Sequence, residues 1–275
     1  MLRQRVESGE VPGPRILTAG QPLFPQDGIP FQLAVSLPQA KLQLLKHPGT
    51  SEEAILDVRQ NIAEGANFIK LFTGSSDSGD PAHLMRAGVA AAAVTEAHRE
   101  HKLSFAHPGN LAGFEIALSA HVDVFAHSTR IPKSICGRYI ERMKQADTAL
   151  IPTLNLYRSD PALSDFLNEV EKYSRRGGLI LFGTDAGDQN QYDPAPEYAL
   201  MQRAGLNWSE ILASLTVAPA QKLNESQVRG QIAPGMKADI VVLGADPAID
   251  VSAFSKVQYT IRNGIIIYQR QSSRF

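Results

Sequence analysis

The sequence predicts an α/β fold of the (β/α)8 barrel type, followed by a small β-sandwich portion. Short apolar segments alternate with helical patterns of about 10 to 15 residues, which is typical of parallel strands joined by helices. Polar side chains occur at the same end of several apolar segments, as at the C-terminal mouth of a barrel. No glycine-rich phosphate-binding motif is present to favour an open nucleotide-binding sheet instead.

Composition limits the classes of protein that this chain can belong to. Its 275 residues are 43% hydrophobic, which is enough for one large domain or two ordinary ones. A net charge of −1 and a pI near 6.7 provide no basic field for nucleic acid and suit small neutral or zwitterionic substrates. The single cysteine, Cys136, excludes an internal disulfide and a multi-cysteine zinc site.

We expect no membrane partner, because no apolar segment approaches the roughly 18 residues that span a bilayer. The first residues also lack the apolar core of a signal peptide. As written, the chain is therefore expected to be cytoplasmic.

Strand and helix signals alternate through the first part of the chain. Residues 2–10 resemble the end of a helix, and residues 15–20 are a predicted strand. Ser51 is a predicted N-cap for a helix that ends before Gly65, and the next strand ends at Lys70. The later elements are strands ending at His107, His127 and Pro152, with helices over residues 84–100, 112–120, 133–146 and 160–176.

The apolar segment over residues 179–187 closes this alternation and carries Asp185 just before Ala186 and Gly187. It is the sixth candidate strand, whereas a closed barrel of this type needs about eight. We therefore expect two further strands before residue 1.

After this segment the pattern changes from barrel units to a β appendage. Helices are predicted over residues 208–216 and 218–223, and an apolar segment over residues 238–243. Residues 257–261 and 265–268 flank Asn263-Gly264, the strongest short hairpin signal. The predicted domains are residues 1–225, a partial barrel, and residues 226–275, a β-sandwich portion.

Together these motifs resemble the amidohydrolase superfamily, in the branch of imidazolonepropionase-like proteins and Xaa-Pro or Xaa-Arg dipeptidases. The motifs are Gly65-Ala-Asn-Phe-Ile-Lys70, Phe105-Ala-His107, Val124-Phe-Ala-His127, Ile151-Pro-Thr-Leu154, Gly183-Thr-Asp-Ala-Gly187 and the segment from Gly230 to Leu243. The resemblance covers essentially the whole chain and implies a TIM-type metal-dependent hydrolase barrel of which strands 3 to 8 are present.

The resemblance also implies a binuclear metal centre, usually of zinc. Lys70, as a carbamate, would bridge the two metals, and His107 and His127 would bind one of them through neutral imidazole nitrogens. Asp185 would bind the other, take a proton from the attacking water as general base and pass it to the leaving nitrogen as general acid. The implied activity is hydrolysis of a C–N bond in a small molecule or dipeptide.

The chain departs from the family pattern at one place. The family has a His-x-His pair at the end of strand 1, and none of the seven histidines here forms such a pair. We therefore expect an N-terminally truncated chain with weakened or no activity by itself, which holds one metal ion or none. With exposed strand edges, it should either be poorly stable or associate as a homo-oligomer. A catalytically silent remnant and a metal-free binding or assembly subunit remain as alternatives.

Each site residue also has an ordinary structural explanation. A single histidine at a strand end is more often a hydrogen-bonded core residue, Lys70 could be a surface lysine, and Asp185 could be a turn former. Their shared position at strand ends favours a site. Tyr157 and Arg158 follow the strand at Pro152 and are candidates for binding a substrate carboxylate. Nothing in the sequence separates Xaa-Pro dipeptides from Xaa-Arg dipeptides, imidazolones or other cyclic amides.

Overall fold

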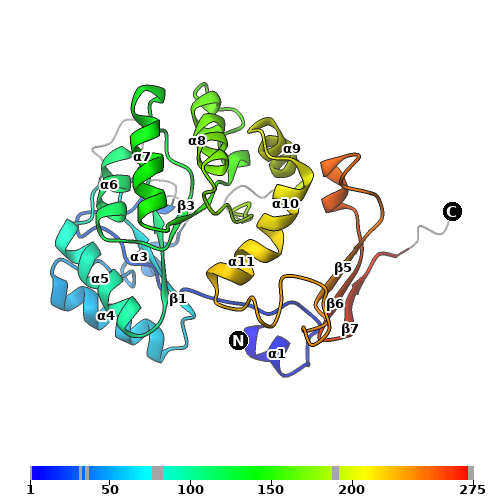
Figure 1. Cartoon of the computed structure of the whole chain (residues 1–275). Coiled ribbons are helices and arrows are strands. Elements are labelled where there is room, and N and C mark those ends of the chain that lie inside the picture. The colour runs from blue at the N-terminus through cyan, green and yellow to red at the C-terminus, as the bar shows by residue number, and fades with distance from the viewer. Residues whose placement is uncertain (1, 31–32, 35–36, 76–82, 188–191, 272–275) are drawn as a thin grey trace. The chain divides into compact units, whose positions relative to one another are not determined.

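The computed structural model describes residues 2–30, 33–34, 37–75, 83–187 and 192–271. Its residues divide into two compact units (Figure 1). The parallel-sheet unit comprises Leu17–Pro152 and Asp160–Ile180, and the antiparallel-sheet unit comprises Met1–Ile16, Thr153–Ser159 and Leu181–Phe275. The predicted domain boundary at residue 225 stays a prediction. Among the described helices, none has the length and apolar composition that crossing a membrane requires.

Four parallel strands form the sheet of the parallel-sheet unit, in the order β1-β2-β3-β4. They confirm four of the predicted strands, and all pairs are parallel. Closure of this sheet into a barrel stays a prediction. The strands are β1 (Phe68–Phe72), β2 (Leu103–His107), β3 (Val124–Ala126) and β4 (Ala149–Ile151).

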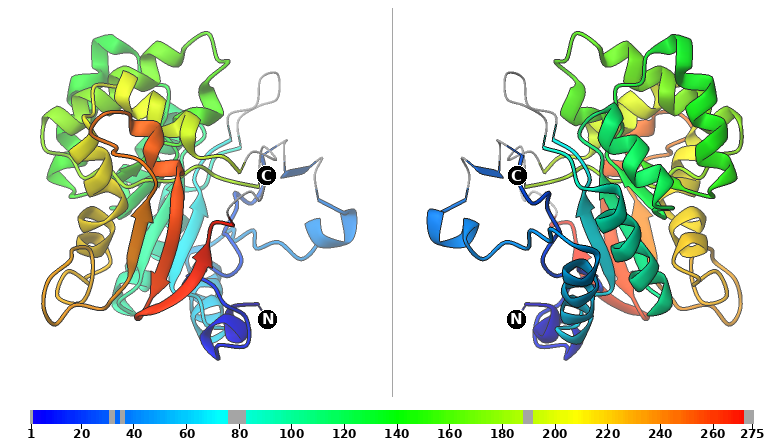
Figure 2. Two further views of the ribbon diagram at one scale, coloured as in Figure 1. Left: turned by 90° about the vertical axis from the view of Figure 1, so that its right-hand side faces the viewer. Right: turned by 90° about the vertical axis from the view of Figure 1, so that its left-hand side faces the viewer.

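Helices connect these strands and pack against the sheet, with α4 and α5 next to β1 and α5 next to β2 (Figure 2). The helix that precedes β1 begins at Ser51 as predicted, but its N-cap lies one residue earlier than predicted. Thr50, not Ser51, is the N-cap, because Glu53 lies three residues after Thr50 and completes a capping box with it. The helices whose bounds lie within the described part of this unit are α3 (Gln39–Leu42), α4 (Ser51–Ala63), α5 (Ala87–Arg99), α6 (Leu111–Ser119), α7 (Lys133–Gln145) and α8 (Leu163–Arg175).

The two faces of the sheet differ in burial because side chains alternate along each strand. On one face, Ile69 and Leu71 of β1 are fully buried, and Phe125 of β3 stacks on Phe114 of α6 at a ring distance of 4.2 Å. On the other face, Lys70 of β1 and His107 of β2 are only half-buried. The apolar face thus holds the sheet against its helices, and the other face carries Lys70 and His107, two of the predicted site residues.

One predicted strand is wrong, and a second is reduced to a single bridge. Residues 15–20 form no strand; instead Leu23 pairs with β1, donating to the Lys70 carbonyl at 2.9 Å and accepting from Phe72 at 2.8 Å. The segment over residues 179–184 makes a single bridge to β4, at Ile180. Beyond Ile180 it leaves the sheet, because the Phe182 amide donates to the Ser214 carbonyl at 3.1 Å.

The antiparallel-sheet unit contains the predicted hairpin, with β6 (Val257–Arg262) paired to β7 (Ile265–Gln269) and to β5 (Ile240–Leu243). Asn263 and Gly264 both have positive φ angles, 50° and 80°, as the tight turn requires. The predicted helices after residue 207 are confirmed, whereas no element was expected at α9. The other elements of this unit are α1 (Leu2–Glu7), the 3-10 helices η1 (Leu154–Tyr157) and η2 (Val251–Ser255), α9 (Ala195–Arg203), α10 (Trp208–Leu215) and α11 (Val217–Lys222).

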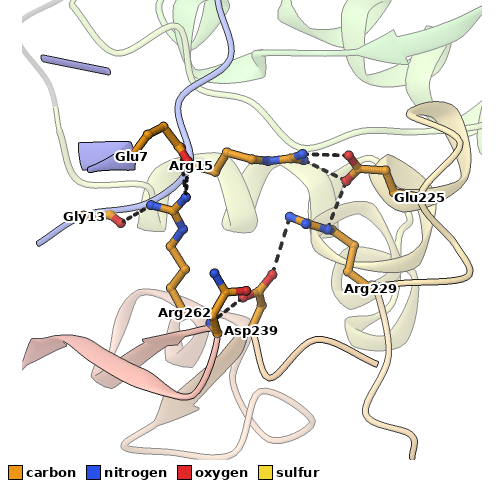
Figure 3. Close-up of polar contacts among 8 residues, drawn as sticks. Glu7, Gly13, Arg15, Glu225, Arg229, Asp239 and Arg262 are labelled. Atoms are coloured by element: carbon orange, nitrogen blue, oxygen red, sulfur yellow. Dashed lines mark hydrogen bonds and ion pairs between the residues drawn. The ribbon is translucent and has the colours of Figure 1, made fainter. Parts of the chain in front are cut away.

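An ion-pair network ties the N-terminal segment of this unit to its C-terminal half (Figure 3). Arg15 forms a bidentate pair with Glu225, with both N–O distances 2.7 Å, and it lowers the pKa of that carboxyl. Arg262 of β6 bridges Glu7 and the Gly13 carbonyl at 2.8 and 3.2 Å. The Arg15–Glu225 pair is partly buried, whereas Glu7 is exposed, so the first pair contributes more to holding the N-terminal segment within this unit.

Candidate functional site

The structure brings three of the predicted site residues together at the C-terminal ends of adjacent parallel strands. His107 is the last residue of β2, and His127 follows directly after β3. Their ring centroids lie 5.3 Å apart, edge to face. Lys70 of β1 points to the same place, because its Nζ donates to the Ala126 carbonyl at 2.9 Å, one residue before His127.

Both imidazoles of this cluster are held in the neutral form. Burial lowers the pKa of His107 to about 3, and the charge of Lys70 adds to the effect. Burial also lowers the pKa of His127 well below its ordinary value, with further contributions from Lys70 and His107. Neutral imidazole is the form that binds a metal ion.

The side chains of this cluster suit a metal ion only when Lys70 is carboxylated. Among the described residues, no group of three or more His, Cys, Asp or Glu side chains could hold a metal. An ammonium at Lys70 would repel a cation, whereas a carbamate would add anionic oxygens beside two neutral imidazoles. The cluster of Lys70, His107 and His127 therefore suits a metal once Lys70 is carboxylated.

Two phenylalanines, which the sequence patterns did not mark, line this cluster. Phe72 lies on the same face of β1 as Lys70, and its ring centroid is 5.4 Å from the Lys70 Nζ and 4.7 Å from the His107 ring. Phe24 stacks on Phe72 at 4.6 Å. The rings keep one side of the cluster apolar and restrict the orientation of the His107 imidazole. The only sequence signal for Phe72 is its spacing of two residues from Lys70.

Close backbone packing fixes the ends of β1 and β2 beside His107. The fully buried Thr73 donates its amide to the His107 carbonyl at 3.0 Å. Gly113, at the start of α6, lies against the backbone of Gly74 and Pro108, and a Cβ there would come within 2.8 Å of the Gly74 Cα and overlap the Pro108 carbonyl oxygen. Only glycine allows this approach.

Replacing Gly113 with alanine is expected to destabilise the protein by about 1 to 3 kcal/mol, since the backbone around Pro108 must move. Gly137 is a matched control, because it is also inside a helix but a Cβ there would meet nothing within 4 Å. Gly137→Ala is expected to raise the free energy of unfolding by about 0.5 to 1 kcal/mol. Urea unfolding of both variants measures the difference, and equal effects would contradict the packing argument.

A fully buried carboxyl group supports the loop after β3. Glu169 of α8 accepts a hydrogen bond from the Thr129 amide at 3.2 Å, two residues after His127. Burial raises the pKa of Glu169 to about 8, although the hydrogen bonds from Ser128 and Thr129 oppose the shift. The sequence gives no signal for this role, because Glu169 is one of several acidic residues on a predicted helix.

Replacing Glu169 with glutamine is expected to change how stability depends on pH. The pKa of Glu169 is raised above its unfolded value of about 4.3, so wild-type stability is full below that pH and declines as pH rises through about 8. Glutamine cannot lose a proton. As pH rises from 5 to 8.5, the free energy of unfolding of the variant should therefore increase relative to that of the wild type by on the order of 1 to 3 kcal/mol. Urea unfolding at several pH values measures this, and parallel curves for the two proteins would contradict it.

The remaining predicted site residues belong to the antiparallel-sheet unit. Asp185 is exposed and has a left-handed backbone, with a φ of 54°. Tyr157 is the last residue of η1 and is half-buried, and Arg158 follows it and is exposed. All three therefore lie in segments outside regular strands.

Comparison with known proteins identifies the family of this chain. The model of the amidohydrolase family matches residues 126–268, more than half of the sequence. No curated protein matches the chain.

Solved structures with a similar fold include an Xaa-Pro dipeptidase with methionine bound in its active site, at 22% identity and a TM-score of 0.81, covering 98% of this chain and 71% of that one. A candidate prolidase from Bifidobacterium longum has 25% identity and a TM-score of 0.79, covering 100% and 71%. Ochratoxinase from A. niger has 19% identity and a TM-score of 0.81, covering 97% and 69%. The fold, with its parallel sheet of four strands and its second, antiparallel sheet, is of the amidohydrolase type. The chain belongs to the amidohydrolase family, and it is a hydrolase that acts on carbon–nitrogen bonds.

Proposed function

We propose that this chain is a zinc-dependent hydrolase that cleaves the amide or peptide bond of a small substrate such as a dipeptide. The observation that carries the proposal is the convergence of Lys70, His107 and His127 at the ends of adjacent parallel strands. Similar solved structures include an Xaa-Pro dipeptidase and a candidate prolidase, which supports dipeptides as the substrate class.

In this proposal the metal ions would be bound by four side chains: Lys70 as a carbamate, His107, His127 and Asp185. Divalent cations at such a site supply Lewis-acid activation of water and of the scissile carbonyl. Asp185 accepts a proton from the attacking water and returns it to the leaving nitrogen, so that a C–O bond forms as the C–N bond breaks. Tyr157 and Arg158 bind the substrate carboxylate.

Purified protein loaded with zinc in the presence of bicarbonate tests this function against a panel of L,L-dipeptides that end in proline or arginine. The expected result is release of free amino acids, loss of activity after chelation, and recovery when zinc is returned. A protein that binds about two equivalents of zinc and hydrolyses no member of the panel would overturn dipeptide hydrolysis.

A second candidate function is single-metal binding without hydrolysis. It is favoured by the absence of a His-x-His pair from the sequence, which removes two of the family's expected ligands. Zinc at about one equivalent per chain, lost in a His107→Ala variant and accompanied by no turnover, would select this candidate.

A further inference from the structure

The segment that carries Tyr157 and Arg158 adopts a conformation that needs support. Thr153 has φ and ψ angles of 46° and 48°, in the left-handed region, where a β-branched residue is an outlier. Such strain costs on the order of 1 to 3 kcal/mol and persists only where surrounding contacts enforce it. The 3-10 helix η1 follows directly, and the Thr153 side chain does not cap it.

The side chain of Glu197 supports this segment through two hydrogen bonds. Its Oε1 accepts from the Leu154 amide at 2.8 Å, and its Oε2 accepts from the Asn155 amide at 2.7 Å. These are the first two N–H groups of η1, which have no partner within the helix. The Glu197 side chain is 1% exposed, so water does not compete for either bond.

The same helix also contacts the segment that leads to Asp185. Tyr198, the next residue of α9, stacks on Phe182 with a ring distance of 4.7 Å and an interplanar angle of 22°. Phe182 lies three residues before Asp185. One turn of α9 therefore contacts the segment of Tyr157 and the segment of Asp185 within a single compact unit.

We infer that Glu197 is a positioning residue that fixes Tyr157 and Arg158 with respect to Asp185 and so determines which substrates the enzyme binds. This inference rests on the proposed function of those three residues. The two amides are bonded to different carboxylate oxygens, and glutamine would place an NH2 group at one of these positions, where it would face an N–H donor. The Glu197→Gln variant should therefore loosen the start of η1 and leave the cluster of Lys70, His107 and His127 intact.

The experiment compares Glu197→Gln with Glu171→Gln, a matched control on α8 whose carboxylate is 46% exposed. Amide hydrogen exchange at Leu154 and Asn155 should accelerate about tenfold or more in Glu197→Gln alone, the effect of losing one buried hydrogen bond. KM for the best dipeptide should rise about tenfold, while kcat stays within about threefold and zinc content is unchanged.

A double-mutant cycle separates positioning from a general loss of structure. In a Tyr157→Phe, Arg158→Ala background, Glu197→Gln should have no further effect on KM, because the groups that it positions are gone. An additive KM effect, or a drop in kcat with KM unchanged, would overturn the inference. If the wild type hydrolyses no dipeptide, the proposed function fails. Faster exchange at Leu154 and Asn155 then still supports Glu197 as the residue that positions the start of η1, and unchanged exchange overturns that role.

Discussion

Replacing Lys70 with methionine is expected to abolish the proposed zinc binding and to lower the proposed dipeptide hydrolysis by at least about 10²-fold. Methionine has a similar length and volume but no amine that could react with carbon dioxide, so the two imidazoles would be the only remaining donors in the cluster. The variant should still fold, since its losses include one charge-assisted hydrogen bond to the Ala126 carbonyl, worth about 1.5 to 3 kcal/mol, and a contact with the Phe72 ring. Zinc per chain after dialysis and the initial rate of hydrolysis measure the effect.

Lys70→Glu offers a positive control, because its carboxylate supplies the anionic oxygens that a carbamate would provide. It should retain more zinc than Lys70→Met. Lys41→Met, at an exposed lysine of α3, controls for the loss of a positive charge and should match the wild type. Equal zinc content in Lys70→Met and wild type would exclude Lys70 as a ligand.

The sheet could be predicted from the sequence because its information is local. Each of the four confirmed strands is a short apolar segment between helical patterns, and parallel neighbours then follow from the helical connections. Strand pairing between residues that are far apart in the sequence does not depend on local information alone. Residues 15–20 have the composition of a strand, yet Leu23 pairs with β1, and the choice depends on contacts that no short window contains.

Competition between similar signals explains two smaller errors. Thr50 and Ser51 are both good N-cap residues, and the position of Glu53 decides for Thr50. The helix at residues 195–203 begins among Pro194 and Pro196, and proline also ends many helices and fills many loops. At the first place the deciding feature is one side chain three residues away, and at the second it is the fixed φ angle of proline. Average composition decides neither.

In the candidate site too, some residues could be predicted from local sequence and others depend on contacts made on folding. Lys70, His107 and His127 could be predicted to lie together because each falls at the end of an apolar strand and has metal-binding chemistry. Glu169 and Glu197 could not, since their roles depend on which backbone amides face them after folding. Buried carboxyl groups that hold the loops after strands are therefore the part of such a site for which a structure is needed.

Replacing Asp185 with asparagine is expected to lower kcat by about 10²- to 10⁴-fold, the usual contribution of a general acid–base group. The backbone conformation at this position allows the substitution without other structural effects. Asp185 has a φ of 54°, and aspartate and asparagine both tolerate the left-handed region, so the variant removes the carboxylate without adding strain. Alanine at this position would combine the loss of chemistry with backbone strain.

Asp147 provides a matched control for the Asp185 experiment, because it is also an exposed aspartate with a left-handed backbone, at a φ of 50°. Asp147→Asn should leave kcat unchanged, and both variants should melt within a few degrees of the wild type. Zinc content separates the two roles of Asp185: a fall in kcat with zinc retained indicates proton transfer, whereas a parallel loss of zinc indicates that ligation dominates. A kcat for Asp185→Asn within about threefold of the wild type would exclude both roles, because a carboxylate that binds metal or moves a proton in the rate-limiting step cannot be replaced by a neutral amide at so small a cost.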